Sequence, residues 1–203
     1  MSARDRILAR VRDAERTGYV PAVQPFRAAD DATGEQLARF LRELTTVGVE
    51  HSVESTDEAV RARVTAIVGD QSVLRWDADR LPYGVGNLLA NAADGASPRD
   101  RQASAAIGVT GCDAAIAETG SLALITGRGK PRAASLLPPV HLAVVRTAEL
   151  RATMGEFFRE RAADLAGAAN CTFITGPSRT ADIELTLTLG VHGPGRVVII
   201  VGP

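Results

Sequence analysis

The segment "AIGVTGCDAAIAETGSLALIT", residues 106–126, contains three short apolar runs separated by small and polar residues. Apolar runs of this length, bounded by glycine and other turn-forming residues, are typical of buried strands. The runs "HLAVVR" (141–146), "CTFITG" (171–176) and "VVIIVG" (197–202) have the same character. Strands that are apolar on both faces occur in parallel sheets covered by helices. These runs therefore predict an α/β fold with a mostly parallel sheet flanked by helices.

Segments with helical character lie between the strand candidates. Thr33 and Thr147 are suitable N-caps, and Gly48 is a suitable helix end. A further strand is expected at either "TAIVG" (65–69) or "SVLRW" (72–76), and the pattern does not decide between them. The expected helices are 33–48, 57–64, 147–167 and 180–187.

The N-terminal residues are expected to form a separate arm. Ser2 can cap a first helix whose apolar face contains Ile7, Leu8 and Val11. The prolines and glycine of residues 17–26 interrupt helical structure and predict an irregular connection. We therefore expect an arm and connection over residues 1–30, which packs on the body or on another subunit, and an α/β domain over residues 31–203.

Composition excludes several functional classes. The chain has 203 residues, 45% hydrophobic residues and a formal net charge of −1, which gives no electrostatic reason to expect nucleic acid or anionic membrane binding. No apolar run approaches the ~20 residues that span a bilayer, and the charged N-terminus does not resemble a signal peptide, so a cytoplasmic location is expected. Cys112 and Cys171 are far apart, which argues against a metal, an iron–sulfur cluster or a disulfide. We expect no cofactor.

Two glycine-containing stretches do not match nucleotide-binding motifs. "GVGNLLA" (84–90) lacks the spacing of a dinucleotide fingerprint, and "GRGKPR" (127–132) lacks the residues of a Walker A loop. The second stretch contains Arg128, Lys130 and Arg132, and Lys130 is the only lysine of the chain. Three cations so close together can attract an anionic substrate. A solvated loop is the preferred interpretation.

Glu118 is a carboxylate placed among strand signals. Partial burial there would adjust its pKa for a role as nucleophile or general acid/base, or it could bind a hydroxyl or amine of a ligand. Thr119 adjoins it, and the N–H groups of Gly120 and Ser121 could act as oxyanion donors. The alternative is a structural glutamate that receives backbone N–H bonds in the turn, and the residues alone leave both open.

The stretch "FITGPSRTADIE" (173–184) predicts an anion site. A strand candidate reaches a turn, and a helix is expected to begin there, so free N–H groups and the helix dipole would favour a carboxylate or phosphate. Arg179 could add a bidentate contact. The alternative is simple helix capping with a solvated arginine. We expect this turn and the turn beside Glu118 to meet in one pocket. The expected ligand-binding residues are Thr119, Gly120, Ser121, Gly176, Pro177, Ser178, Arg179 and Thr180.

Two histidines are ambiguous. His192 lies in "GVHGPGR" (190–196), a tight connection that leads into the last strand candidate and so belongs to the edge opposite the usual ligand edge of an α/β sheet. His141 begins "HLAVV" and is either a buried, hydrogen-bonded residue or a general base.

Three ordered stretches, "VTGCDAAIAETGSLAL" (109–124), "LLPPVHLAVVRTAEL" (136–150) and "TFITGPSRTADIELTLTLGVHGPGRVVIIVG" (172–202), resemble the LUD-domain family and, within it, the lactate utilization protein C type. The resemblance is close from Ile107 onward and loose before it. It implies a fold similar to the sugar isomerase and CoA-transferase superfamily. It also implies a role in oxidation of L-lactate to pyruvate beside partner proteins that carry iron–sulfur clusters.

The resemblance leaves more than one function open. We expect an accessory component of lactate utilization that binds a small anionic metabolite, with the redox step on an iron–sulfur partner. The alternative is an acyl- or CoA-transferase-like or sugar-phosphate isomerase-like enzyme, because Glu118-Thr119-Gly120 looks like the nucleophile motif of the related CoA-transferases. A third possibility is an assembly subunit without a small ligand.

Overall fold

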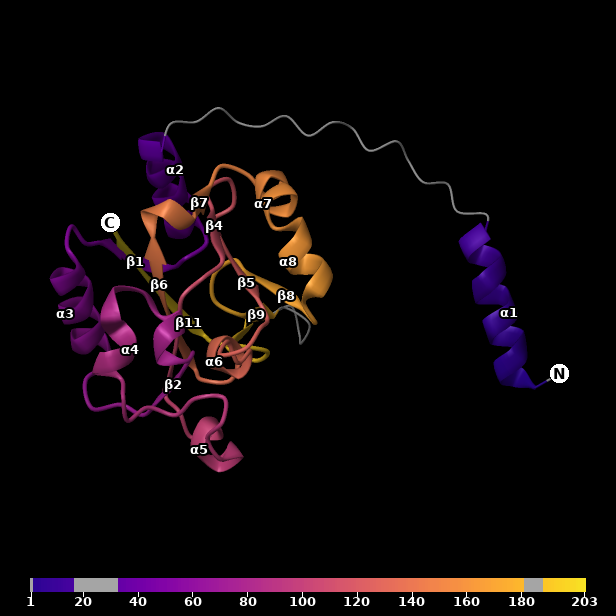
Figure 1. The fold of residues 1–203 in the computed structure, drawn as a ribbon, viewed down its shortest axis with the longest axis horizontal. Coiled ribbons are helices and arrows are strands. Elements are labelled where there is room, and N and C mark those ends of the chain that lie inside the picture. The colour runs from indigo at the N-terminus through magenta and orange to yellow at the C-terminus, as the bar shows by residue number, and fades with distance from the viewer. Residues whose placement is uncertain (1, 17–32, 181–187) are drawn as a thin grey trace.

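A five-stranded parallel sheet forms the centre of the molecule (Figure 1). The structure is a computed structural model that describes residues 2–16, 33–180 and 188–203. Every neighbouring pair in this sheet is parallel, which confirms the predicted mostly parallel α/β architecture. In spatial order the strands are β1 (Glu50–Val53), β11 (Arg196–Gly202), β6 (Val140–Arg146), β3 (Ile107–Thr110) and β2 (Val73–Arg75).

A second sheet lies beside the first and is mostly antiparallel. Its order is β7 (Leu150–Arg151), β4 (Ala114–Ile116), β5 (Ser121–Ile125) and β8 (Cys171–Ile174). The three apolar runs of residues 106–126 therefore divide between two sheets. The connection from β4 to β5 is only four residues long, which permits an antiparallel hairpin but not a parallel crossover.

The segment after β8 is not the start of a helix. Arg179–Thr180 forms strand β9, which pairs antiparallel with β10 (Thr188–Leu189). Two backbone hydrogen bonds hold this segment in an extended conformation. The N–H of Ser178 donates to the Pro194 carbonyl at 2.8 Å, and the N–H of Gly190 donates to the Ser178 carbonyl at 2.9 Å. The helix predicted over 180–187 is wrong at Thr180, and its remaining residues lie outside the described part of the chain.

Helices cover both sheets (Figure 1). Helix α2 begins at Thr33 and ends at Thr46, and Gly48 (φ 78°) then turns the chain into β1. Helix α3 (Asp57–Val68) contains most of "TAIVG", so the predicted strand comes from "SVLRW" instead. The other described helices of the body are α4 (Val85–Leu88), α5 (Arg99–Ala103), α6 (Ala133–Leu136), α7 (Met154–Glu160) and α8 (Ala162–Gly167), with 3-10 turns η1 (Ala78–Arg80), η2 (Pro82–Gly84) and η3 (Thr147–Glu149).

The predicted helix from Thr147 to Gly167 is wrong over its first seven residues. Thr147 begins the short turn η3, and strand β7 follows it. Thr153 is the actual cap, because its hydroxyl accepts a bond from the N–H of Glu156 at 3.2 Å. Leu150 lies in β7, where its buried side chain joins the main core, and this tertiary packing overrides the helical spacing.

Two hydrophobic clusters hold the body together. The larger one surrounds the parallel sheet and includes Phe40 and Leu44 of α2, which are fully buried. The smaller one lies between the second sheet and α7 and α8, and it includes Ile116 and Phe157. Phe157 also makes an edge contact with Phe173 of β8, at a centroid distance of 5.5 Å.

Helix α1 (Ala3–Arg16) is the predicted N-terminal helix, and the Ser2 hydroxyl accepts a bond from the N–H of Asp5 at 3.2 Å. Its apolar residues Ile7, Leu8 and Val11 are 63%, 41% and 51% exposed, so the described body does not cover this face. Figure 1 draws α1 apart from the sheets. No described helix is both long and apolar enough to cross a membrane.

Candidate functional site

The two segments predicted to bind a ligand lie side by side. Strands β5 and β8 pair with Leu122 opposite Ile174, which brings Ser121 and Thr175 to the same end of the sheet. Their hydroxyl oxygens are 2.6 Å apart, and the Thr119 hydroxyl donates to Ser121 Oγ at 2.8 Å. A chain of three hydroxyls therefore connects the turn after β4 with the turn after β8.

The end of α2 closes against both turns. Gly120 has φ 65°, and a Cβ there would lie 3.0 Å from the carbonyl carbon of Glu43 and the nitrogen of Leu44. Gly176 has φ 90°, and a Cβ there would lie 2.9 Å from the Val47 carbonyl oxygen. Both positions require glycine for the conformation and for the approach of α2. The backbone that lies closest to Gly176 is therefore that of Val47, directly after α2.

Glu118 is half-buried and bonded to the start of α7. Its Oε1 accepts the N–H of Met154 at 2.6 Å, and its own N–H donates to the Ala152 carbonyl at 3.1 Å. A carboxylate that receives a free N–H at a helix start stabilises that helix. This contact favours the structural alternative for Glu118, although it occupies only one of the two carboxylate oxygens.

Arg179 and Ser178 contact backbone groups. Arg179 Nη2 donates to the Val47 carbonyl at 2.7 Å, while the rest of the side chain is exposed. Ser178 Oγ accepts the N–H of His192 at 3.3 Å, so the "GVHGPGR" connection meets the "GPSRT" turn. The expected N–H groups of a helix start are absent at these described residues, because Arg179 and Thr180 belong to β9. Pro177 and Thr180 are half-buried beside them.

His141 lies inside the parallel sheet and is fully buried. Its Nε2 is 2.9 Å from the hydroxyl oxygen of Thr110, and its Nδ1 has no partner among the described residues. Burial lowers the pKa of His141 to about 4, so the ring is neutral near pH 7. A ring without solvent access cannot reach a diffusing substrate, which favours the buried, hydrogen-bonded alternative.

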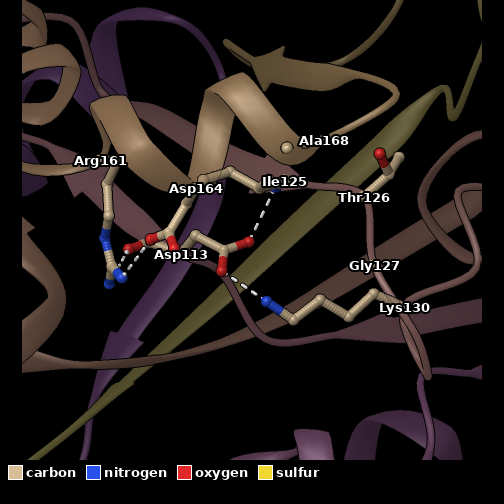
Figure 2. Close-up of a pocket in the computed structure, with 9 residues that line it drawn as sticks. Asp113, Ile125, Thr126, Gly127, Lys130, Arg161, Asp164 and Ala168 are labelled. Carbon is tan, nitrogen blue, oxygen red and sulfur yellow. Dashed lines mark hydrogen bonds and ion pairs between the residues drawn. The ribbon is translucent and has the colours of Figure 1, made fainter.

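A cavity of about 310 Å³ lies at the other end of β5 (Figure 2). Its walls come from the start of β4, the end of β5, the following loop and α8. No group of His, Cys, Asp and Glu in the described part of the chain could hold a metal ion. The cavity is lined by Asp113, Ile125, Thr126, Gly127, Lys130, Arg161, Asp164, Gly167 and Ala168.

Ion pairs order the polar side chains of this cavity. Asp113 Oδ1 lies 2.5 Å from Lys130 Nζ, and Asp113 Oδ2 accepts the N–H of Ile125 at 2.8 Å. Arg161 Nη2 donates to the Asp113 carbonyl at 3.2 Å, and Arg161 Nη1 donates to Asp164 Oδ2 at 3.1 Å. Lys130 Nζ also lies 5.2 Å from the ring centroid of Trp76. Figure 2 shows Lys130 and Arg161 on two sides of Asp113.

Most of the residues that line this cavity carry no signal in the sequence. The solvated-loop interpretation is right for Arg128 and Arg132, which are exposed, but wrong for Lys130, whose side chain is only 21% exposed. Asp113 and Arg161 were not identified. The one available signal was Asp113 itself, a carboxylate directly before the strand run "AAIA".

Comparisons with known proteins agree over most of the chain. The LUD domain model matches residues 22–201. Lactate utilization protein C of Shouchella clausii is 30% identical over 192 residues, with 87% of this chain and 83% of that protein covered, and the protein of the same name from Halalkalibacterium halodurans matches to the same extent. The crystal structure of a DUF162 family protein from Deinococcus radiodurans superposes with a TM-score of 0.69 at 25% identity, with 85% of this chain and 99% of that chain covered. The chain belongs to the LUD domain family.

Proposed function

We propose that this protein is an accessory component of L-lactate utilization that binds a small anionic metabolite and acts with an iron–sulfur partner. The relatives named lactate utilization protein C support the pathway. Most iron–sulfur clusters are held by four cysteine thiolates, whereas this chain has two cysteines, which supports a redox step on another protein.

The proposed metabolite site consists of the turns after β4 and β8. The observation that carries it is the meeting of these turns on the end of α2, through the contact between Ser121 and Thr175. The arginine of this site, Arg179, uses one described bond, to Val47, and a guanidinium has five N–H donors. Glu118 would face the hydroxyl end of the ligand through its second oxygen. His141 is left out of the proposed site because it is fully buried.

A thermal-shift series tests the proposed site. L-Lactate, pyruvate, a CoA ester and a sugar phosphate are added to the wild-type chain, and a ligand that binds only the folded state raises the melting temperature. Arg179→Met should abolish or reduce the shift given by at least one compound that raises the wild-type melting temperature. The control Arg10→Met removes an exposed arginine of α1 and should leave the shift unchanged. If all four compounds leave the wild-type melting temperature unmoved, metabolite binding is rejected.

The iron–sulfur partner is tested separately. Tagged protein should co-purify with an iron-containing protein when expressed in a host grown on L-lactate, and the absorbance of the eluate should show the cluster. An eluate without iron under these conditions rejects the partner.

The rival proposal is a CoA-transferase-like or isomerase-like enzyme that uses Glu118. It predicts that Glu118→Gln abolishes turnover and a covalent thioester adduct. The accessory role predicts that this variant retains ligand affinity within a modest factor, because the carboxylate is already bonded to Met154.

A further inference from the structure

We infer that the cavity beyond the end of β5 is a second binding site, for a small monocarboxylate that carries a hydroxyl or amino group next to its carboxylate. Ser121 and Ile125 are the two ends of β5, so this cavity and the proposed metabolite turns lie at opposite ends of one strand. The inference therefore goes beyond the proposed function and does not depend on it.

Asp113 fixes the inner wall of the cavity. Its side chain is 12% exposed, and each carboxylate oxygen already accepts a bond, one from Lys130 and one from the N–H of Ile125. Because both oxygens of Asp113 are already bonded, this carboxylate positions Lys130 and does not contact the ligand. Lys130 keeps donors for a ligand, because an ammonium has three N–H groups and only one is directed at Asp113.

Arg161 supplies the second cation. Its Nη2 is held by the Asp113 carbonyl and its Nη1 by Asp164, so the guanidinium is oriented before any ligand arrives. Ordering of a binding group in advance reduces the entropy lost on binding. A ligand carboxylate placed in the cavity can accept from both Lys130 and Arg161.

The charges select the class of ligand. Lys130 and Arg161 are balanced by Asp113 and Asp164, so the cavity has no excess positive charge to hold a dianion such as a phosphate group. The Asp164 side chain is 55% exposed and can accept a further hydrogen bond. A ligand carboxylate can accept hydrogen bonds from the two cations, and a neighbouring O–H or N–H of the ligand can donate to Asp164. A volume of about 310 Å³ suits a molecule of few heavy atoms.

The single lysine of the chain makes a direct experiment possible. Protein expressed with ¹³Cε-lysine should give one side-chain resonance, from Lys130, which is then titrated with L-lactate, L-alanine, acetate and inorganic phosphate. We expect a saturable shift with L-lactate or L-alanine, and whichever of the two is tighter identifies the donor as hydroxyl or amino. Acetate lacks the donor and should bind about 10-fold more weakly, equivalent to one hydrogen bond. Phosphate should give no saturable shift.

Matched variants decide the result. Arg161→Gln should abolish the saturable shift, and Arg128→Met, which removes an exposed cation of the same loop, should preserve it. Asp164→Ala keeps both cations but removes the acceptor, and should make acetate and the tighter ligand bind equally, which serves as the test if Arg161→Gln does not fold. Equal binding of acetate to the wild type, saturable binding of phosphate, or no saturable shift with any probe overturns the inference. Arg179→Met should leave the Lys130 titration unchanged, so this site and the proposed metabolite site can fail separately.

Discussion

The two ends of β5 carry polar groups in different arrangements. At the Ser121 end, hydroxyls, a carboxylate and a guanidinium bond to one another or to backbone groups, and two glycines let α2 close over them. At the Ile125 end, Lys130 and Arg161 are also paired, but they line an open volume of about 310 Å³. The same strand thus connects a tightly packed polar turn with a charged cavity.

This difference shows that suitable residue types and an available binding volume are separate properties. Glycine, serine, threonine and arginine in a turn are favourable for anions. The same residues also satisfy the protein's own backbone, as Arg179 does with Val47. Tertiary packing decides how much space remains between the helices and strands around such a turn. That space decides whether the turn residues bind an anion or the protein's own backbone.

The largest effect should come from adding one methyl group at the packed end. Gly120→Ala places a Cβ at φ 65° and 3.0 Å from the α2 backbone, which should lower the free energy of unfolding by about 3 kcal/mol. Gly127→Ala is the matched control at the other end, since a Cβ there meets nothing within 4 Å and should change stability by less than about 0.5 kcal/mol. Urea denaturation measures both. Equal losses of stability for the two variants would show that the Ser121 end of β5 is no more tightly packed than the Ile125 end.

The ion pair at the cavity should give the next largest effect. Lys130→Met leaves the Asp113 carboxylate with only the N–H of Ile125, and should lower the free energy of unfolding by about 1–3 kcal/mol. Arg128→Met should change it by less than about 0.5 kcal/mol, because this residue is exposed. Adding Asp113→Asn to Lys130→Met should recover part of the loss. A fully additive double variant would show that the two side chains do not interact.

Glu118→Gln should have a smaller effect at the packed end. The neutral amide still offers an oxygen to the Met154 N–H but loses the charge at the start of α7, so we expect a loss of about 1 kcal/mol in the same denaturation experiment. Thr153→Ala removes the hydroxyl cap of this helix and should cost a similar amount. If Glu118→Gln leaves stability unchanged while Thr153→Ala does not, the carboxylate does not support α7, and the catalytic alternative regains weight.

Local patterns predicted the central fold well. The strand runs at 141–146 and 197–202 form the middle of the parallel sheet, where continuous apolar runs fit because both faces of each strand are buried. The patterns did not separate the two sheets, since β4 and β5 look like buried parallel strands in composition. The helix expected from Thr147 also failed, because Leu150 has the correct spacing but packs in a strand beside β4.

The candidate site was predictable only in part. Sequence spacing cannot show that Ser121 and Thr175 are neighbours, because β8 reaches β5 after a long excursion through α7 and α8. The expectation that the two turns meet in one pocket is a hypothesis that the turn residues suggest and their spacing cannot support. The cavity at the Ile125 end was missed because its residues are far apart in the sequence. Asp113 and Arg161 belong to no local motif, Lys130 was assigned to a solvated loop, and only the hairpin and α8 bring the three together.

Arg179→Met should have the smallest effect on stability and so gives the sharpest comparison with Lys130→Met. Arg179 is exposed and makes one described bond, to the Val47 carbonyl, which water can replace, so the free energy of unfolding should change by less than about 0.5 kcal/mol. Lys130 should stabilise the fold and bind a ligand at once, whereas Arg179 should matter for a ligand alone. Measuring stability and ligand response on both variants tests this. A large loss of stability for Arg179→Met would mean that the guanidinium holds the backbone after α2 in place. The proposed metabolite site would then have no cation available for a ligand.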